Sequence, residues 1–240
     1  MLGRLVAAAC LLTGCDRLFA LEHIDELEDG HVGDADARAD AADAGPCVVN
    51  ETFEGNTLGP MWQEYNVSSE ATIAVAGGRF AVTPPASISA YNGMFSPVGF
   101  NLVDGSVEVE LVQALMTGNT DVQFVVQPDF SVSEYFLIFI SGGSYIGFRK
   151  YTGGTKDETG SSYNGTDDRF LRIRFEGEDV LFETSQSGAA DTWTARRRIA
   201  AELPRTNLHV MLLAGTYDTA PDVPGTALYD NLKICLAGQH

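Results

Sequence analysis

The clearest pattern in the chain is the alternation of apolar and polar residues over short segments. Residues 106–111 read Ser-Val-Glu-Val-Glu-Leu, and residues 171–176 read Leu-Arg-Ile-Arg-Phe-Glu. A period of two places the apolar side chains on one face of a β-strand. Residues 135–140 are continuously apolar instead, which is typical of a strand that is covered on both faces. These segments predict β structure.

The same reasoning predicts further strands at 48–53, 72–76, 79–83, 121–127, 144–151, 179–185, 192–198, 207–214 and 228–236. Pairs of turn-forming residues separate the strands: Gly77-Gly78, Pro84-Pro85, Asn92-Gly93, Asp104-Gly105, Gly118-Asn119, Gly142-Gly143, Gly153-Gly154 and Asn164-Gly165. After residue 47, no segment of ten or more residues has a helical period. About a dozen strands in residues 47–240 predict one all-β domain, built as a two-sheet sandwich.

The N-terminus has the organisation of an export signal over residues 1–14, with Arg4 followed by an apolar run at 5–12. That run is too short to span a membrane, which takes about 20 residues. It ends in Leu-Thr-Gly-Cys at 12–15, which resembles the lipobox of bacterial lipoproteins. The resemblance implies cleavage before Cys15, a lipid on its sulfur, and anchoring in a membrane of the bacterial cell envelope. An ordinary secretory signal is the alternative.

Residues 15–46 are predicted to form an acidic, disordered tether behind the lipidated cysteine. Residues 34–46 hold no apolar side chain larger than Ala, so they cannot offset the entropy cost of their own ordering. Repulsion between like charges keeps such a segment extended. The chain is therefore divided into a signal peptide at 1–14, a tether at 15–46 and a globular domain at 47–240.

The composition limits which classes of molecule the protein can bind and which cysteines are available to form a disulfide. The 240 residues carry 15 Lys and Arg against 33 Asp and Glu, a net charge of −18, which argues against nucleic acid because phosphate binding needs a basic face. Cys10 leaves with the signal and Cys15 would carry lipid. The two remaining cysteines, Cys47 and Cys235, bracket the domain and predict a disulfide in an oxidising compartment. Two unpaired buried thiols are the alternative.

Several short phrases resemble the concanavalin A-like lectin/glucanase jelly roll, in the laminin-G-like form found in bacterial surface lipoproteins. They lie at 51–55 with 60–62, at 77–82, at 168–174 with 180–185 and Trp193, and at 228–234. The resemblance implies a two-sheet antiparallel jelly-roll sandwich. It also implies that the first and last strands lie side by side, which independently favours the bond between Cys47 and Cys235.

The laminarinase-like branch of that fold carries Glu-x-Asp-x-x-Glu on one strand. Residues 108–113 here read Glu-Val-Glu-Leu-Val-Gln, so Gln113 stands at the position of the acid that protonates the leaving oxygen. A neutral amide has no proton to donate. The sequence therefore predicts no catalytic residues and no enzymatic activity, with Glu108 and Glu110 paired instead to Arg172 and Arg174 across a sheet.

Sugars are commonly bound by aromatic rings with a few polar groups for orientation. Tyr145, Arg149 and Tyr151 share one face of a strand by parity, and we expect them to line a groove with two arginines of another strand. The candidate ligand-binding residues are Trp62, Tyr65, Tyr145, Arg149, Tyr151, Arg172 and Arg174. Packing of the aromatic rings at the sheet margins is the alternative.

No cofactor is predicted. Glu51, Glu54 and Asp230 would approach one another if the terminal strands adjoin, but two or three oxygens fall short of the six to eight that calcium takes, so a metal stays open. The favoured function is a membrane-anchored, non-catalytic lipoprotein whose lectin-like sandwich binds glycan or another cell-surface ligand. The alternatives are a structural envelope lipoprotein without a small-molecule site and a degenerate glycoside hydrolase.

Overall fold

The computed structural model describes residues 47–237 except 87, 130–132 and 219–222. The expected signal peptide, the lipidated Cys15 and the acidic tether lie outside the described residues. Within the described ranges, no helix combines the length and the apolar character that a membrane span requires.

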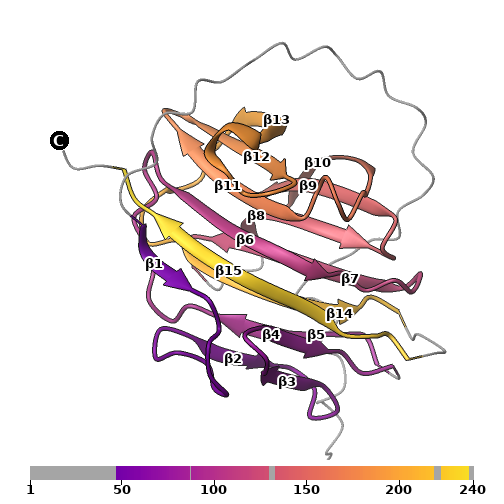
Figure 1. Cartoon of the computed structure of the whole chain (residues 1–240). Helices are drawn as coiled ribbons and strands as arrows, with labels where there is room; N and C mark the ends of the chain where they lie inside the picture. Colours follow the sequence, from indigo (N-terminus) through magenta and orange to yellow (C-terminus); the bar gives the residue numbers. More distant parts are fainter. Residues whose placement is uncertain (1–46, 87, 130–132, 219–222, 238–240) are drawn as a thin grey trace, which may run out of the picture. The chain divides into compact units, whose positions relative to one another are not determined.

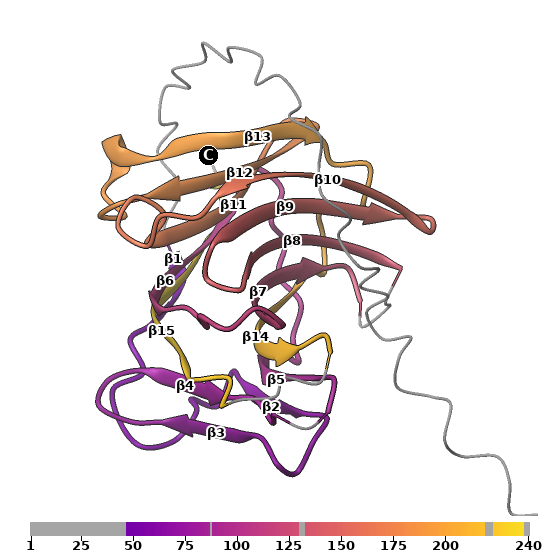
Figure 2. The ribbon, with the colours of Figure 1, turned by 90° about the vertical axis from the view of Figure 1, so that its right-hand side faces the viewer.

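The chain folds into two antiparallel sheets (Figure 1). Sheet A has the order β13 (Thr194–Ala200), β12 (Asp179–Ser185), β11 (Phe170–Glu176), β6 (Ser106–Gln113), β15 (Ala227–Cys235), β4 (Phe80–Thr83) and β3 (Thr72–Val75), and β1 (Cys47–Glu51) also pairs with β15. Sheet B has the order β10 (Thr155–Ser162), β9 (Tyr145–Thr152), β8 (Glu134–Ser141), β7 (Thr120–Gln127), β14 (His209–Thr216), β5 (Ala90–Phe95) and β2 (Gln63–Asn66). Figure 2 shows β7 to β10 following one another across sheet B.

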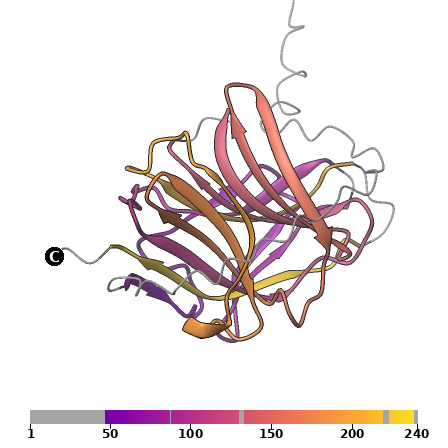
Figure 3. The ribbon, with the colours of Figure 1, turned by 90° about the horizontal axis from the view of Figure 1, so that it is seen from above.

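The two sheets enclose one apolar core. Val107 of β6 and Phe175 of β11 project into it from sheet A, and Phe124 of β7 and Phe136 of β8 project into it from sheet B. The rings of Phe136 and Phe175 meet edge to face across the interface, 5.3 Å between centroids. Figure 3 shows the orange strands of sheet A and the salmon strands of sheet B as separate layers. The predicted all-β, two-sheet antiparallel jelly-roll sandwich is confirmed.

The strands expected from alternation at 72–76, 121–127 and 179–185 are observed within one residue of those bounds. Three observed strands, β2, β5 and β10, were not expected. Strand β10 reads Thr-Lys-Asp-Glu-Thr-Gly-Ser-Ser and is mostly exposed at the edge of sheet B. It has no apolar alternation, because backbone pairing with β9 and polar contacts such as the Arg149–Glu158 ion pair hold it in the sheet.

Asn92 and Gly93 were expected to form a turn, but they lie inside strand β5. A Cβ atom on Gly93 would stand 1.9 Å from the carbonyl oxygen of Leu212 in the neighbouring strand. The buried side-chain oxygen of Asn92 accepts hydrogen bonds from the backbone N–H groups of Val67 and Ser68, at 2.9 and 3.0 Å. Gly93 allows the close approach of the neighbouring strand, and Asn92 bonds to a nearby loop. These tertiary contacts override the tendency of the Asn-Gly pair to form a turn.

The first and last strands of the domain lie side by side, as the family resemblance implied. Strand β1 pairs with β15, with Cys47 opposite Cys235, and a disulfide joins the two residues. The predicted disulfide is confirmed.

Candidate functional site

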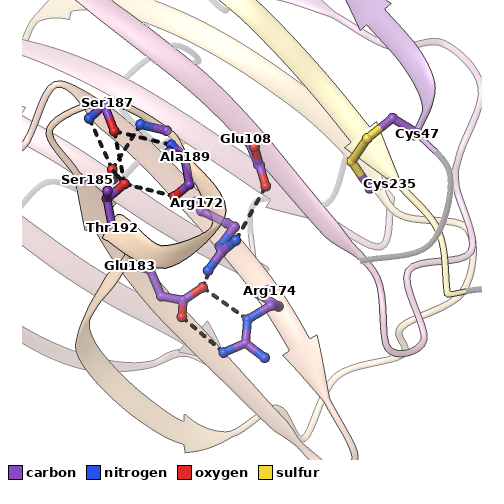
Figure 4. Close-up of polar contacts among 11 residues, drawn as sticks. Cys47, Glu108, Arg172, Arg174, Glu183, Ser185, Ser187, Ala189, Thr192 and Cys235 are labelled. Carbon is purple, nitrogen blue, oxygen red and sulfur yellow. Dashed lines mark hydrogen bonds and ion pairs between the residues drawn. A yellow bond between two sulfur atoms is a disulfide. The ribbon is translucent and has the colours of Figure 1, made fainter. Parts of the chain in front are cut away.

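The outer face of sheet A is a network of ion pairs (Figure 4). The carboxylate of Glu183 in β12 accepts hydrogen bonds from Nε of Arg172 at 2.6 Å and from a terminal guanidinium nitrogen of Arg174 at 3.0 Å. Arg172 also reaches Glu108 at 3.4 Å and lies over the Trp193 ring, 4.1 Å from its centroid. Burial alone would raise the pKa of Glu183, but the two guanidinium groups outweigh it and hold the pKa below its ordinary value.

Glu110 is also fully engaged on this face. Its carboxylate accepts hydrogen bonds from Nε of Arg169 at 2.7 Å and from the amide of Asn231 at 2.6 Å. The expected pairing of Glu108 with Arg172 is confirmed, whereas Glu110 pairs with Arg169 and not with Arg174. The reason is the register, in which Arg174 stands opposite Ser106.

The outer face of sheet B has a different character. Arg149 of β9 forms an ion pair with Glu158 at 2.5 Å, and its guanidinium lies 4.9 Å from the centroid of the Phe139 ring. Tyr135 and Tyr151, in register on neighbouring strands, stack with their ring centroids 5.2 Å apart. Aromatic rings and a buried ion pair therefore lie together on this face.

The structure does not bring the predicted binding residues together. Tyr145, Arg149 and Tyr151 point outward from sheet B, whereas Arg172 and Arg174 belong to sheet A. The expected groove between the two sets is therefore wrong. Parity along a strand predicts which residues share a face, but it does not say which sheet the strand joins.

Two further candidates, Trp62 and Tyr65, lie elsewhere. Trp62 belongs to the apolar core, 5% exposed, and its ring N–H donates to Glu51 at 3.2 Å. Tyr65 of β2 packs edge to face on Phe95 of β5, with ring centroids 6.4 Å apart. For Trp62 the packing alternative is the observed one.

A carboxyl group that the sequence analysis did not single out lies on the outer face of sheet B. Asp121 of β7 is buried, 3% exposed, and its Oδ2 accepts a hydrogen bond from the Tyr91 hydroxyl at 3.0 Å. Burial raises the pKa of Asp121 to about 6, while side-chain hydrogen bonds with Ser141 and Tyr91, the positive charge of Arg149 and a further hydrogen bond with Gln123 oppose the rise. A carboxyl group with this pKa is partly protonated near neutral pH.

Polar atoms without a well-formed hydrogen bond lie at this carboxyl group and two residues along the same face of β7. The other oxygen of Asp121 and both side-chain amide atoms of Gln123 are buried and make no hydrogen bond of good geometry. Buried polar groups in folded proteins are nearly always paired, and an unpaired one is costly.

The sequence held one signal for this cluster. Asp121 and Gln123 are the polar members of an alternating segment whose apolar members, Val122 and Phe124, face the core. The alternation predicts the strand, but it does not mark Asp121 and Gln123 as functional residues, because they form no known motif.

In the described part of the chain, no group of three or more His, Cys, Asp or Glu residues is placed to bind a metal ion. One oxygen of Glu51 accepts the backbone N–H of Phe53, and the other accepts the Trp62 ring N–H. Burial and the nearby Glu110 and Glu54 charges raise the pKa of Asp230.

Comparison with known proteins places the fold. No family model and no curated protein matches the chain. A laminarinase (endo-1,3-β-glucanase) catalytic domain from Thermotoga petrophila matches with a TM-score of 0.62 and 10% identity over 81% of this chain and 98% of its own. A β-1,3-1,4-glucanase (lichenase) from a mouse hindgut metagenome matches with a TM-score of 0.59 and 10% identity, over 79% and 99%. An endo-acting O-glycanase of the human gut microbiota matches with a TM-score of 0.60 and 11% identity, over 80% and 100%.

At these identities the likeness establishes the concanavalin A-like jelly roll, the fold of the glucanases. The neighbours are glycan-cleaving enzymes, and this finding overturns the expectation of a non-catalytic binding module. The expectation that the chain is not an enzyme is overturned with it. The part of that expectation that placed Glu108 and Glu110 in ion pairs with arginine is confirmed, with Arg172 and Arg169 as the partners. Glu108 and Glu110 are structural ion-pair partners, and the Gln113 amide donates to the Thr226 carbonyl at 2.7 Å.

Proposed function

We propose that the domain is a slow glycoside hydrolase, with its site on the outer face of sheet B and Asp121 as the proton donor. The observation that carries the proposal is the buried Asp121 carboxyl, hydrogen-bonded to Tyr91, with the incompletely bonded amide of Gln123 two residues along the same face of β7. Aromatic side chains on the same face, among them the stacked Tyr135 and Tyr151, suit the apolar faces of sugar rings.

The protonation state of Asp121 suits general acid catalysis. A proton donor works best when its pKa lies near the working pH, and burial raises the pKa of Asp121 to about 6.

In the proposed step, the O–H bond of protonated Asp121 breaks and the proton moves to the glycosidic oxygen. The bond between that oxygen and the anomeric carbon breaks, and its electron pair stays on the oxygen. Water adds to the anomeric carbon and releases a proton to solvent, from which Asp121 is protonated again.

The site departs from the usual pair of catalytic carboxyl groups, which lie roughly 5 to 9.5 Å apart. In the register of sheet B, the residues on either side of Asp121 are Ser141 and Gly215. No carboxylate at those two described positions can activate the water. Since a general base contributes about 10²- to 10⁴-fold, we expect a correspondingly low turnover number.

The test is the release of reducing ends from β-1,3-glucan and mixed β-1,3-1,4-glucan. Asp121→Asn keeps the shape of the side chain but removes the proton, so the rate should fall by about 10²- to 10⁴-fold. The matched control is Glu108→Gln, the same change of carboxyl to amide on sheet A, which should retain the wild-type rate. Equal rates for wild-type protein and Asp121→Asn, or no release by the wild-type protein, would contradict the proposal.

We further propose that the domain is held at the bacterial cell envelope by lipid on Cys15. The support is the lipobox-like Leu-Thr-Gly-Cys at 12–15 behind an apolar run, and several acyl chains give stable anchoring where one does not. Labelling of cells with a fatty acid should mark the wild-type protein and leave Cys15→Ala unmarked. Label that persists on Cys15→Ala would refute the anchor.

A further inference from the structure

Tyr91 reaches Asp121 across an intervening strand. Gly215 of β14 pairs with Tyr91 on one side and with Asp121 on the other, so the three residues form one row across sheet B. A Cβ atom on Gly215 would stand 2.5 Å from Cδ1 of the Tyr91 ring. The absence of a side chain on Gly215 therefore leaves the space in which the tyrosine ring lies over β14.

We propose that Tyr91 is a positioning residue for Asp121, whose hydroxyl holds Oδ2 and thereby reserves Oδ1 as the oxygen that carries the proton to the substrate. This inference rests on the proposed function. Its basis is geometric, since Oδ2 accepts the Tyr91 hydroxyl at 3.0 Å in a buried setting, while Oδ1 makes no hydrogen bond of good geometry. The side chains of Ser141 and Gln123 also act on the carboxyl group, but neither of them titrates.

The hydrogen bond decides where the proton resides. While the Tyr91 hydroxyl donates to Oδ2, a proton on Oδ2 would oppose it, so protonation occurs at Oδ1. The other charged or titratable groups that act on Asp121 are Arg149 of β9, whose charge favours the ionised carboxyl, and Tyr217 after β14. Arg149 is itself paired with Glu158, so Tyr91 is the titratable neighbour bonded directly to the carboxyl.

Removal of the hydroxyl has an effect of known sign. The bond from Tyr91 favours the ionised carboxylate, so its loss should raise the midpoint of the Asp121 titration. Hydrogen bonds to charged groups are worth enough to shift such a midpoint by about one pH unit. The rate of glycan hydrolysis needs the protonated form, so its decline toward alkaline pH should move upward by the same amount.

The experiment compares full-length wild-type protein, Tyr91→Phe and the control Tyr163→Phe. Tyr163 is a partly buried tyrosine packed against the core near Asp168, far along the chain from Asp121. The carboxyl carbon of Asp121 is titrated by ¹³C NMR, with its signal assigned from Asp121→Asn, and the pH dependence of hydrolysis is measured in parallel. We expect a midpoint near 6 for the wild-type protein and for Tyr163→Phe, and a midpoint about one unit higher for Tyr91→Phe.

Two failures can be told apart. Wild-type protein that titrates as expected but hydrolyses no glycan would refute the proposed function. An unchanged Asp121 midpoint in Tyr91→Phe, in protein that hydrolyses glycan, would refute the positioning role and leave the function intact.

Discussion

The outer faces of the two sheets use polar side chains in opposite ways. On sheet A, the carboxylates of Glu108, Glu110 and Glu183 each accept hydrogen bonds from arginine or asparagine. On sheet B, Asp121 and Gln123 are as deeply buried as Glu110 and Glu183, and each keeps side-chain atoms that make no hydrogen bond of good geometry. A satisfied polar network makes the fold rigid, whereas an unsatisfied one remains costly until a ligand completes it. The buried carboxylates of sheet A therefore hold the fold together, whereas Asp121 and Gln123 are the buried polar groups that we assign to the proposed site on sheet B.

The largest effect is expected from a substitution that removes the central carboxylate of the ion-pair network on sheet A. Glu183→Ala would leave the guanidinium groups of Arg172 and Arg174 buried without their shared carboxylate. Removal of one member of a buried ion pair costs about 3 to 5 kcal/mol. The free energy of unfolding, measured with urea at pH 7, should fall by about that amount.

The matched control is Glu176→Ala. Glu176 also bonds to Arg174, at 2.7 Å, but its side chain is 42% exposed. Exposed ion pairs contribute about 1 kcal/mol or less, so this variant should be nearly as stable as the wild-type protein. Equal losses for Glu183→Ala and Glu176→Ala would mean that burial does not distinguish the two carboxylates.

The second prediction is that the two faces respond to pH in opposite directions. On sheet A the pKa of Glu183 is lowered, so its contribution is present above the ordinary pKa of 4.5 and is lost as the pH falls through its folded value. On sheet B the pKa of Asp121 rises from 3.8 to about 6. The contribution of Asp121 to stability is therefore fully present below pH 3.8, and it is lost as the pH rises through this interval, a change of about 3 kcal/mol.

The contribution of Asp121 is isolated by Asp121→Asn, because the amide does not ionise. At pH 7 to 8 the variant should be more stable than the wild-type protein, and near pH 3.5 the two should be equal. Urea unfolding across this range measures the difference, and Glu108→Gln provides the control on sheet A. A difference between wild-type protein and Asp121→Asn that does not change with pH would contradict the raised pKa.

Much of the fold could be predicted from the sequence, because a strand with one buried face has alternating apolar and polar residues. The alternation at 106–111 and 171–176 predicted two strands that lie next to each other in sheet A. Edge strand β10 has no such alternation, since its side chains are mostly exposed. The disulfide was also predictable, because Cys47 and Cys235 bracket the domain and its terminal strands adjoin.

The site was far less predictable from the sequence. Glu108 and Glu110 attracted attention because two carboxylates on alternate positions look like catalytic chemistry, but their partners come from residues about 60 or more positions away. Tyr91 and Asp121 are 30 residues apart and become neighbours only because strand β14 enters between their strands. Strand order, which decides both cases, is not encoded in local periodicity.

The smallest expected effect comes from one substitution made on both faces. Gln123 on sheet B is buried with both amide atoms unpartnered, whereas the Gln113 amide on sheet A donates to the Thr226 carbonyl at 2.7 Å. Gln123→Leu removes a buried unsatisfied group and should raise the free energy of unfolding by about 1 kcal/mol, while Gln113→Leu loses a hydrogen bond and should lower it by about 0.5 to 1 kcal/mol.

The opposite signs are the informative result, because the chemical change is identical in the two variants. If the Gln123 amide binds the substrate, Gln123→Leu should also raise KM for glycan, since the bound hydroxyl groups lose their partner. Gln113→Leu should leave KM unchanged, because that amide already bonds to the backbone of Thr226. A stabilised Gln123→Leu with wild-type KM would show that the unpartnered amide is only a cost to the fold. A destabilised Gln123→Leu would show that the amide is satisfied in solution, and the contrast between the two outer faces would not hold at this residue.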